Sequence, residues 1–252
     1  TRPGPPSSSQ LGPLPPERPQ ADAVVDRERG AAGDAEAADG TRLHSQYTRY
    51  SAVARGSWSK GRLRYDLLAV PSLAEDVGTV VDAGQFDAPA GADASVAAQA
   101  GVVCAVLTAD CLPLLLCDRQ GRRAAAAHAG WRGLLAGVIE RTAAAITESP
   151  DDILAWLGPA IGPRAFEVDD ELRHAFIAED PASAPHFVAH GAGHWLADLY
   201  GLARLRFARL GIGHVSGGEY CTFSDPARFF SYRRDGVTGR MASMKRVSSN
   251  EV

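Results

Sequence analysis

The sequence predicts an α/β fold in which layered, mixed β-sheets are flanked by helices. Three short apolar segments, at 102–107, 112–117 and 122–129, are separated by polar or turn residues, which is typical of buried strands. The segment at 133–149 has apolar residues at helical spacing. A further apolar run at 153–158 precedes another helical pattern, so strands and helices alternate along the chain.

Three helices can be placed from their apolar stripes and their end residues. The helix predicted over 133–149 has one stripe, formed by Leu135, Val138, Ile139, Thr142 and Ile146. Asp169 is suited to cap a second helix that begins in DDELRHAFIAED. Apolar spacing predicts a third helix from Leu196 to Leu210, and Gly211 is suited to end it in a left-handed conformation.

The chain is expected to comprise a leader and one domain. Residues 1–45 are rich in Pro, Ser, Gly, Ala and charge without a sustained apolar period, which predicts a disordered or atypical leader. Apolar pieces occur over 47–90, but their periodicity is weak. We assign residues 46–252 to a single domain.

The composition argues against several classes of protein. The 252 residues are 45% hydrophobic and 22% charged, as in ordinary soluble globular proteins. A net charge of −4 and a pI near 6.0 provide no basic field for a phosphate backbone, so no nucleic-acid partner is expected. No apolar run reaches the about 18 residues that span a bilayer, and no secretory signal is evident, so no membrane partner is expected either. The expected location is cytoplasmic, where the four cysteines are thiols or metal ligands rather than disulfides.

Cys111 lies in the turn between two apolar segments, within TADCLPLLLCD at 108–118. A thiol at the end of a strand can face a cleft. A lone cysteine is, however, more often a buried structural residue. Cys111 is therefore a candidate that needs a partner.

His128 is that partner candidate, because a run of small residues leads to it in AAAAHAGWRG at 124–133. Small side chains allow a ligand or backbone to approach closely, and Trp131 offers a flat ring for stacking. Arg132, near the start of a helix, can meet an anion. The structural alternative is a core histidine beside a packing tryptophan.

Together, Cys111 and His128 suit a zinc site, because thiolate and imidazole are ligands that this ion prefers. A catalytic zinc usually has three protein ligands and an open position for water. The two side chains equally suit a Cys–His dyad, in which His128 takes the proton of Cys111 and a covalent intermediate follows. Spacing leaves both readings open.

Aromatic, hydroxyl and cationic residues gather in FFSYRRDGVTGRMAS at 229–243. Aromatic rings can hold a base, and the forked donors of arginine can hold a phosphate. A solvated arginine-rich turn is the structural alternative. The expected substrate-binding residues of this segment are Phe230, Ser231, Arg233, Arg234 and Arg240, in addition to Trp131 and Arg132.

The order of five segments over about 92–245 closely resembles the YfiH/laccase-domain family; they are TADCLPLLLCD, AHAGWRGLLAGV, LGPAIGPRAFEV, WLADLYGLARLRFARLGI and FFSYRRDGVTGRMAS. The resemblance implies a single α/β domain with the YfiH-like fold. It also implies a site for zinc, with copper as the alternative, built from one Cys and two His, of which Cys111 and His128 match two. The implied activity is phosphorolysis of adenosine, inosine and methylthioadenosine with phosphate, together with adenosine deamination.

The chain departs from the family pattern upstream of Cys111. The family carries its remaining histidine in a Gln-Val-His-Gly motif, whereas this chain reads EDVGTVVDA at 75–83. If Gly78 is the glycine of the motif, Val77 occupies the histidine position and cannot ligate a metal. His44 is the sole histidine upstream of Cys111. We hypothesise that the region before Gly78 derives from a shifted reading frame or a diverged segment, and an intact frame on resequencing would exclude the first origin.

Three other functions stay open. A Cys–His hydrolase editing peptidoglycan precursors would use Cys111 as its nucleophile and would need no third ligand. A phenol oxidase, as an older name of the family suggests, would need many imidazoles around several copper ions, and the seven histidines show no such clusters. An inactive homologue is favoured by Val77, because the loss of one ligand weakens metal binding. The sequence makes no prediction of the oligomeric state.

Overall fold

The computed structural model describes residues 53–59, 62–69, 79–83, 92–147 and 149–247. The predicted leader at 1–45, His44, and the Val77 and Gly78 positions all lie outside these residues. Within the described part of the chain, no helix is long and apolar enough to cross a membrane.

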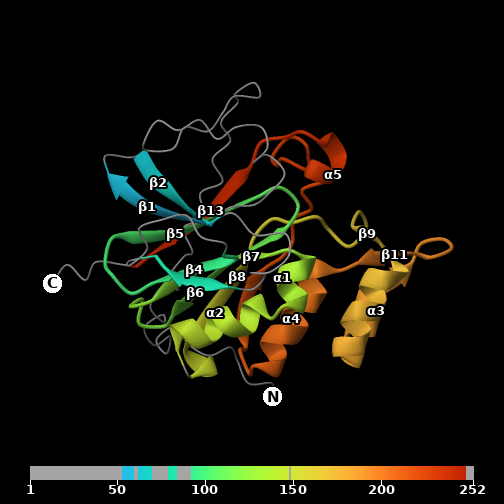
Figure 1. The fold of residues 1–252 in the computed structure, drawn as a ribbon, viewed down its shortest axis with the longest axis horizontal. Helices are drawn as coiled ribbons and strands as arrows, with labels where there is room; N and C mark the ends of the chain where they lie inside the picture. The colour runs from blue at the N-terminus through green and yellow to red at the C-terminus, as the bar shows by residue number, and fades with distance from the viewer. Residues whose placement is uncertain (1–52, 60–61, 70–78, 84–91, 148, 248–252) are drawn as a thin grey trace, which may run out of the picture.

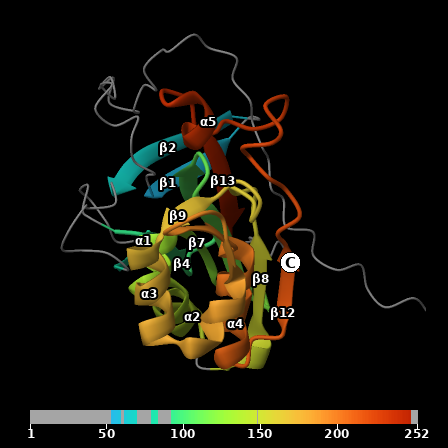
Figure 2. The same cartoon turned by 90° about the vertical axis from the view of Figure 1, so that its right-hand side faces the viewer.

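The described residues form three layers, in which helices cover one face of a mixed sheet and a second sheet covers the other (Figures 1 and 2). The central sheet has the strand order β12-β8-β6-β7-β4-β3, with bounds His214–Gly217, Ile153–Leu157, Leu112–Asp118, Ala124–Ala129, Ala94–Ala97 and Val80–Asp82. The second sheet has the order β13-β5-β1-β2, with bounds Met241–Arg246, Val102–Thr108, Val53–Ser59 and Arg62–Ala69. The predicted fold of layered mixed sheets flanked by helices is confirmed.

In Figure 2 the helices lie together on one side of the central sheet, except for the short α5 at the top, and a small third sheet lies near α3. They are α1 Trp131–Leu135, α2 Val138–Ile146, α3 Asp170–Glu179, α4 Leu199–Arg209 and the separate α5 Tyr232–Asp235, with short 3-10 helices at Pro150–Asp152 and Pro181–His186. The third sheet has the order β10-β11-β9, with bounds Phe187–Ala189, His194–Ala197 and Glu167–Asp169.

Side-chain alternation along β6 and β7 divides the core into two parts. Leu112, Leu114 and Leu116 point to the helical side, whereas Leu115 belongs to a smaller cluster with residues of β5. The alanines of β7 alternate in the same way, with Ala124 and Ala126 in the smaller cluster. Because β7 is so rich in alanine, helix and sheet can approach it closely from both faces.

The three predicted apolar strands correspond to β5, β6 and β7, and the run at 153–158 corresponds to β8. The single helix predicted over 133–149 is wrong, because Gly137 at φ +78° separates α1 from α2. Of the predicted stripe, Val138, Ile139, Thr142 and Ile146 are buried on α2. The break leaves α1 as a separate short helix directly after β7.

The cap of α3 is confirmed, since the Asp169 side chain accepts a hydrogen bond of 2.9 Å from the backbone N–H of Leu172. The third predicted helix ends as expected, with Gly211 at φ +75°. Its predicted start is wrong, because Leu196 belongs to β11 and the helix begins at Leu199. Strand pairing with β9 and β10 overrides the helical spacing there.

Candidate functional site

Cys111 lies in the short turn between β5 and β6. Asp110, the residue before it, has φ +90°, and among the described residues no other residue except glycine has a positive φ. This left-handed conformation is unfavourable for most side chains and is best tolerated by Asn and Asp. It allows the chain to reverse within three residues, and Cys111 is left partly exposed at the end of β6.

His128 lies near the end of β7, on the face that Ala124 and Ala126 turn toward the second sheet. Its ring Nδ1 lies 3.4 Å from Oδ1 of the buried Asp93. The backbone N–H of His128 also donates to the carbonyl of Asp93 at 2.7 Å. A carboxylate at Nδ1 favours the proton on that nitrogen, which leaves the Nε2 lone pair free to bind.

Nε2 of His128 and Sγ of Cys111 meet at Gly130. A Cβ atom placed on Gly130 would lie 3.2 Å from Sγ and 3.3 Å from Nε2, so both atoms border the same small space. Nε2 is buried and has no hydrogen-bond partner among the residues the structure describes. A buried polar atom without a partner is costly, and one that faces a thiol is arranged for a ligand.

The pKa of His128 reflects two opposing effects. Burial, the largest effect, lowers it, but the adjacent Cys111 and the Asp93 carboxylate together raise the pKa to about 10. The metal-free ring of His128 is therefore protonated at neutral pH, and a metal ion that binds Nε2 would displace that proton. A positively charged metal ion satisfies the same demand as a proton.

The carboxylate of Asp110 connects this turn to the C-terminal segment. Its Oδ1 accepts from Thr222 Oγ1 at 2.6 Å, and its Oδ2 accepts from Ser231 Oγ at 3.0 Å and from the backbone N–H of Arg233 at 2.6 Å. The backbone carbonyl of Asp110 accepts from the N–H of Ile161 at 2.8 Å. The β8–β9 connection, the β12–α5 connection and the start of α5 thus converge on the residue before Cys111.

Arg234 uses all of its side-chain donors inside the protein. Nη1 donates to the carbonyls of Thr222 and Phe223, and Nη2 donates to the carbonyl of Phe229. Nε and Nη2 bind both carboxylate oxygens of Asp235 at 2.8 Å and 2.7 Å. No N–H remains for phosphate in this arrangement, so Arg234 serves as a clamp for the loop.

Arg240 directly precedes β13, whose first residue, Met241, pairs with Thr108 at the end of β5, three residues before Cys111. Burial lowers the pKa of Arg240, while the nearby Cys111 and Asp110 oppose that change. Its guanidinium stays charged at neutral pH. Within the described part of the chain, only its Nη1 is engaged, by the carbonyls of Thr238 and Gly239 at 3.0 Å.

The remaining predicted residues lie in different surroundings. The guanidinium of Arg132 lies 4.2 Å from the ring centroid of Trp131. Arg233 is exposed and donates to the carbonyl of Glu167 at 3.0 Å. The ring of Phe230 lies against Gly239, where a Cβ atom would come within 2.9 Å of it. Ser231 is fully buried and caps α5 by accepting from the N–H of Arg234.

Sequence reasoning missed Asp93, Asp110 and Gly130. The TADC segment contains Asp110, but its partners lie more than a hundred residues away in sequence. Asp93 precedes a four-residue strand and carries no local signal. Gly130 was visible within HAGWRG, where a small residue beside a ligand candidate suggests close approach.

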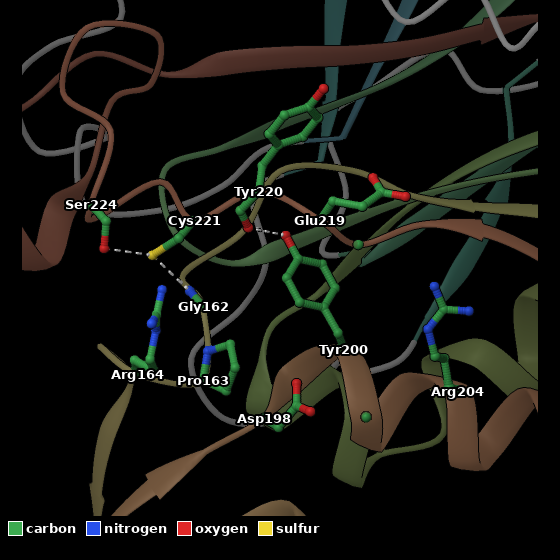
Figure 3. A pocket seen from close by; sticks show the side chains of 12 residues that line it. Gly162, Pro163, Arg164, Asp198, Tyr200, Arg204, Glu219, Tyr220, Cys221 and Ser224 are labelled. Carbon is green, nitrogen blue, oxygen red and sulfur yellow. Dashed lines mark hydrogen bonds between the residues drawn. The ribbon is translucent and has the colours of Figure 1, made fainter.

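An open pocket of about 430 Å³ lies around Cys221 (Figure 3). The Cys221 sulfur accepts from the backbone N–H of Gly162 at 3.2 Å and lies 3.3 Å from Ser224 Oγ. Burial opposes ionisation of Cys221, but these hydrogen bonds together lower the pKa of its thiol. None of the predicted site residues lines this pocket.

Comparison with known sequences places these observations in a family. Residues 73–247 match the model of the family described as multi-copper polyphenol oxidoreductase laccase. The purine nucleoside phosphorylase YfiH of Escherichia coli K12 is 57% identical over 152 residues, which are 60% of this chain and 62% of that protein. A purine nucleoside phosphorylase of Xylella fastidiosa Temecula1 is 46% identical over 181 residues, covering 71% of this chain and 67% of that protein. The chain thus spans about three fifths of the E. coli relative.

Solved structures resemble the chain as well. The Neisseria meningitidis protein NMB0706 shares 50% identity with a TM-score of 0.66, over 68% of this chain and 72% of that one. YlmD from Geobacillus stearothermophilus shares 29% identity with a TM-score of 0.62, over 72% of this chain and 74% of that one.

Proposed function

Because the chain belongs to the multi-copper polyphenol oxidoreductase laccase family, we propose that it is a purine nucleoside phosphorylase centred on Cys111 and His128. The names of the E. coli and X. fastidiosa relatives support this activity. The observation that carries the proposal is the meeting of Sγ and an unpartnered Nε2 beside Gly130. A thiol and an imidazole so placed form a site for chemistry rather than for packing.

The donor set fits a zinc ion, with copper as the alternative. Thiolate sulfur and imidazole nitrogen are both preferred zinc ligands, and Asp93 holds His128 in the orientation seen in carboxylate–histidine–zinc sites. Among the described residues, no group of three His, Cys, Asp or Glu side chains could hold a metal. The third ligand position, Val77 by family order, lies outside those residues. When bound, zinc would act there as a Lewis acid.

Arg240 is the proposed phosphate-binding residue. It combines a permanent charge, proximity to Cys111, and donors on Nε and Nη2 that no described residue engages. A partly buried guanidinium binds a phosphate through paired, charge-assisted hydrogen bonds more strongly than an exposed one. Arg233 and Arg132 lie at the surface and are secondary candidates.

In the proposed reaction, a phosphate oxygen bonds to C1′ of the ribose while the bond from C1′ to N9 of the purine breaks. The electron pair of that bond leaves with the base, which takes up a proton. Arg240 orients the phosphate, and Phe230, partly exposed beside Arg240, offers a ring on which the base can stack. Adenosine, inosine and methylthioadenosine are the proposed substrates.

Deamination of adenosine is the proposed second reaction of the same centre. Water replaces the amino group at C6 and ammonia leaves, so no phosphate is consumed. This reaction rests on family resemblance alone.

A thiol hydrolase acting on peptidoglycan precursors is the second candidate function. The approach of Cys111 and His128 beside Gly130 favours it, because an imidazole held next to a thiol can take the proton of that thiol. Such an enzyme would act without a metal and without phosphate.

The test is chromatography of adenosine and inosine incubated with the purified protein, with and without phosphate. We expect ribose 1-phosphate and free base only when phosphate is present, with inosine from adenosine in both cases. Cys111→Ser and His128→Ala should each lose more than about a hundredfold in kcat/KM. Cys221→Ser and the exposed His174→Ala are the matched controls and should keep the activity.

Formation of inosine without any free base would show that the protein deaminates adenosine but does not phosphorolyse nucleosides. No turnover of nucleosides, combined with cleavage of a peptidoglycan peptide, would favour the hydrolase.

A further inference from the structure

We propose that Asp110 is a positioning residue for Arg240, and that it thereby determines the affinity of the site for phosphate. The assignment rests on the proposed phosphorylase function. Beyond that function, it names the buried carboxylate that holds the phosphate-binding loop against the Cys111 turn.

The loop that carries Arg240 is anchored at both ends to the same short stretch of chain. Upstream, Ser231 and Arg233 bind Oδ2 of Asp110. Downstream, Met241 begins β13 and pairs with Thr108 on β5. The segment 236–240 is therefore held at its two ends by Asp110 and Thr108, which are only two residues apart in sequence.

At its upstream end, the loop reaches the Cys111 turn through hydrogen bonds to Asp110. Arg234, the other clamp, binds carbonyls of the 222–229 segment and the neighbouring Asp235, and none of these belongs to that turn. Asp110 thus couples the C-terminal segment to the residue that would bind the metal. Loss of its carboxylate would release the start of the loop.

The charge of Asp110 adds to this geometric role. Its carboxylate attracts the guanidinium of Arg240, although the two are not in a direct ion pair among the contacts described. Asp110 is buried, so the attraction is weakly screened by solvent. It draws Arg240 toward Cys111 without occupying the donors that a phosphate needs.

The backbone at Asp110 dictates which substitutions are informative. Asn and Gly both tolerate φ +90°, so Asp110→Asn and Asp110→Gly leave the turn unstrained. Asn can keep an oxygen toward Ser231 and Arg233 while its amide faces Thr222, whose hydroxyl can rotate to accept. Asp110→Asn therefore removes the charge but keeps the anchors, whereas Asp110→Gly removes both.

The experiment measures KM for phosphate, KM for inosine and metal content in purified variants. Asp110→Gly should raise KM for phosphate by about tenfold or more, because a displaced binding group costs up to about a hundredfold. Its KM for inosine should change by less, and its zinc content should equal that of the wild type. Asp110→Asn should recover most of the phosphate affinity.

Two single-hydroxyl variants separate positioning from general stability. Ser231→Ala and Thr222→Val each remove one buried hydrogen bond to the same carboxylate. Ser231 lies on the segment that leads to Arg240, so its loss should raise KM for phosphate more than the loss of Thr222. This contrast also serves if Asp110→Gly does not fold.

The matched control is Asp118→Asn at the opposite end of β6. Asp118 is also a buried carboxylate with local partners, Arg122 and the N–H of Arg123. Asp118→Asn should leave KM for phosphate, KM for inosine and the metal content unchanged.

An unchanged KM for phosphate in Asp110→Gly, or equal effects of Ser231→Ala and Thr222→Val, would overturn the assignment. Wild-type protein that does not use phosphate at all would overturn the proposed function, and the role of Asp110 with it.

Discussion

At the scale of single residues, the space beside Gly130 makes the site possible. Its backbone, at φ −64° and ψ 169°, is open to any residue, so the position does not require glycine for conformational reasons. Glycine is favoured there because a Cβ would lie only 3.2 Å from Sγ of Cys111 and 3.3 Å from Nε2 of His128, which is tighter than ordinary van der Waals contact.

Gly130→Ala should therefore impair the site without impairing the fold. The new methyl would push Sγ and Nε2 apart by a few tenths of an ångström, which should weaken zinc binding by about tenfold. Zinc titration with a competing chelator measures the change.

Gly213→Ala is the control, because no atom lies within 4 Å of the added Cβ and its φ is not left-handed. Equal zinc affinity in the two variants would contradict the proposed role of Gly130.

The residue scale also shows why the site was only half predictable. Cys111 and His128 were expected from the family order of their segments, and each lies where an apolar strand meets a turn. Arg240 and Arg234 lie six residues apart in one segment, and sequence could not separate a free guanidinium from one that is fully used. The difference depends on carbonyls at 222–229, which only the folded loop brings into reach.

At the scale of elements, Gly137 separates the short α1, which directly follows β7, from α2. Gly137→Ala should destabilise the protein by about 1–2 kcal/mol, because φ +78° is unfavourable for a residue with a Cβ. Urea unfolding at pH 7 measures the free energy.

Gly213→Ala, in open space, serves as the reference for the same substitution. A free energy of unfolding for Gly137→Ala equal to that reference would contradict the account of the break.

The loop around α5 should depend on the planar fork of Arg234. Arg234→Lys should lower the free energy of unfolding by about 2 kcal/mol or more, since lysine cannot reach three carbonyls and Asp235 together. The exposed Arg122→Lys should change it by less than about 0.5 kcal/mol. Thermal and urea unfolding compare the two.

The Arg234–Asp235 pair also predicts a pH dependence. The hydrogen bond from Arg234 lowers the pKa of Asp235 below its ordinary value. Its contribution is then present above the unfolded pKa of about 3.9 and is lost as the pH falls through the lower folded value. Arg234→Lys should therefore lower the free energy of unfolding by less when the pH is below the folded pKa of Asp235. A larger loss at that acidic pH than at pH 7 would contradict this prediction.

At the scale of the whole molecule, the layered fold follows from patterns that are strong in some strands and weak in others. β6 is buried at every position, so its continuous apolar run identified it. β13 reads MASMKR with half-buried positions and depends on pairing with β5, so no local pattern revealed it. The last two residues of β11 fit the helical spacing that begins at Leu196, and only pairing with β9 and β10 places them in a strand.

The central claim is that Cys111 and His128 hold a metal ion, and metal stoichiometry tests it most directly. Elemental analysis of the purified wild type should find zinc, or copper in its place, at about one ion per chain. Cys111→Ser and His128→Ala should each lose most of it, while Cys221→Ser should not. Wild-type metal content that is unchanged in both variants, or that is absent after purification and reconstitution with zinc, would contradict the claim.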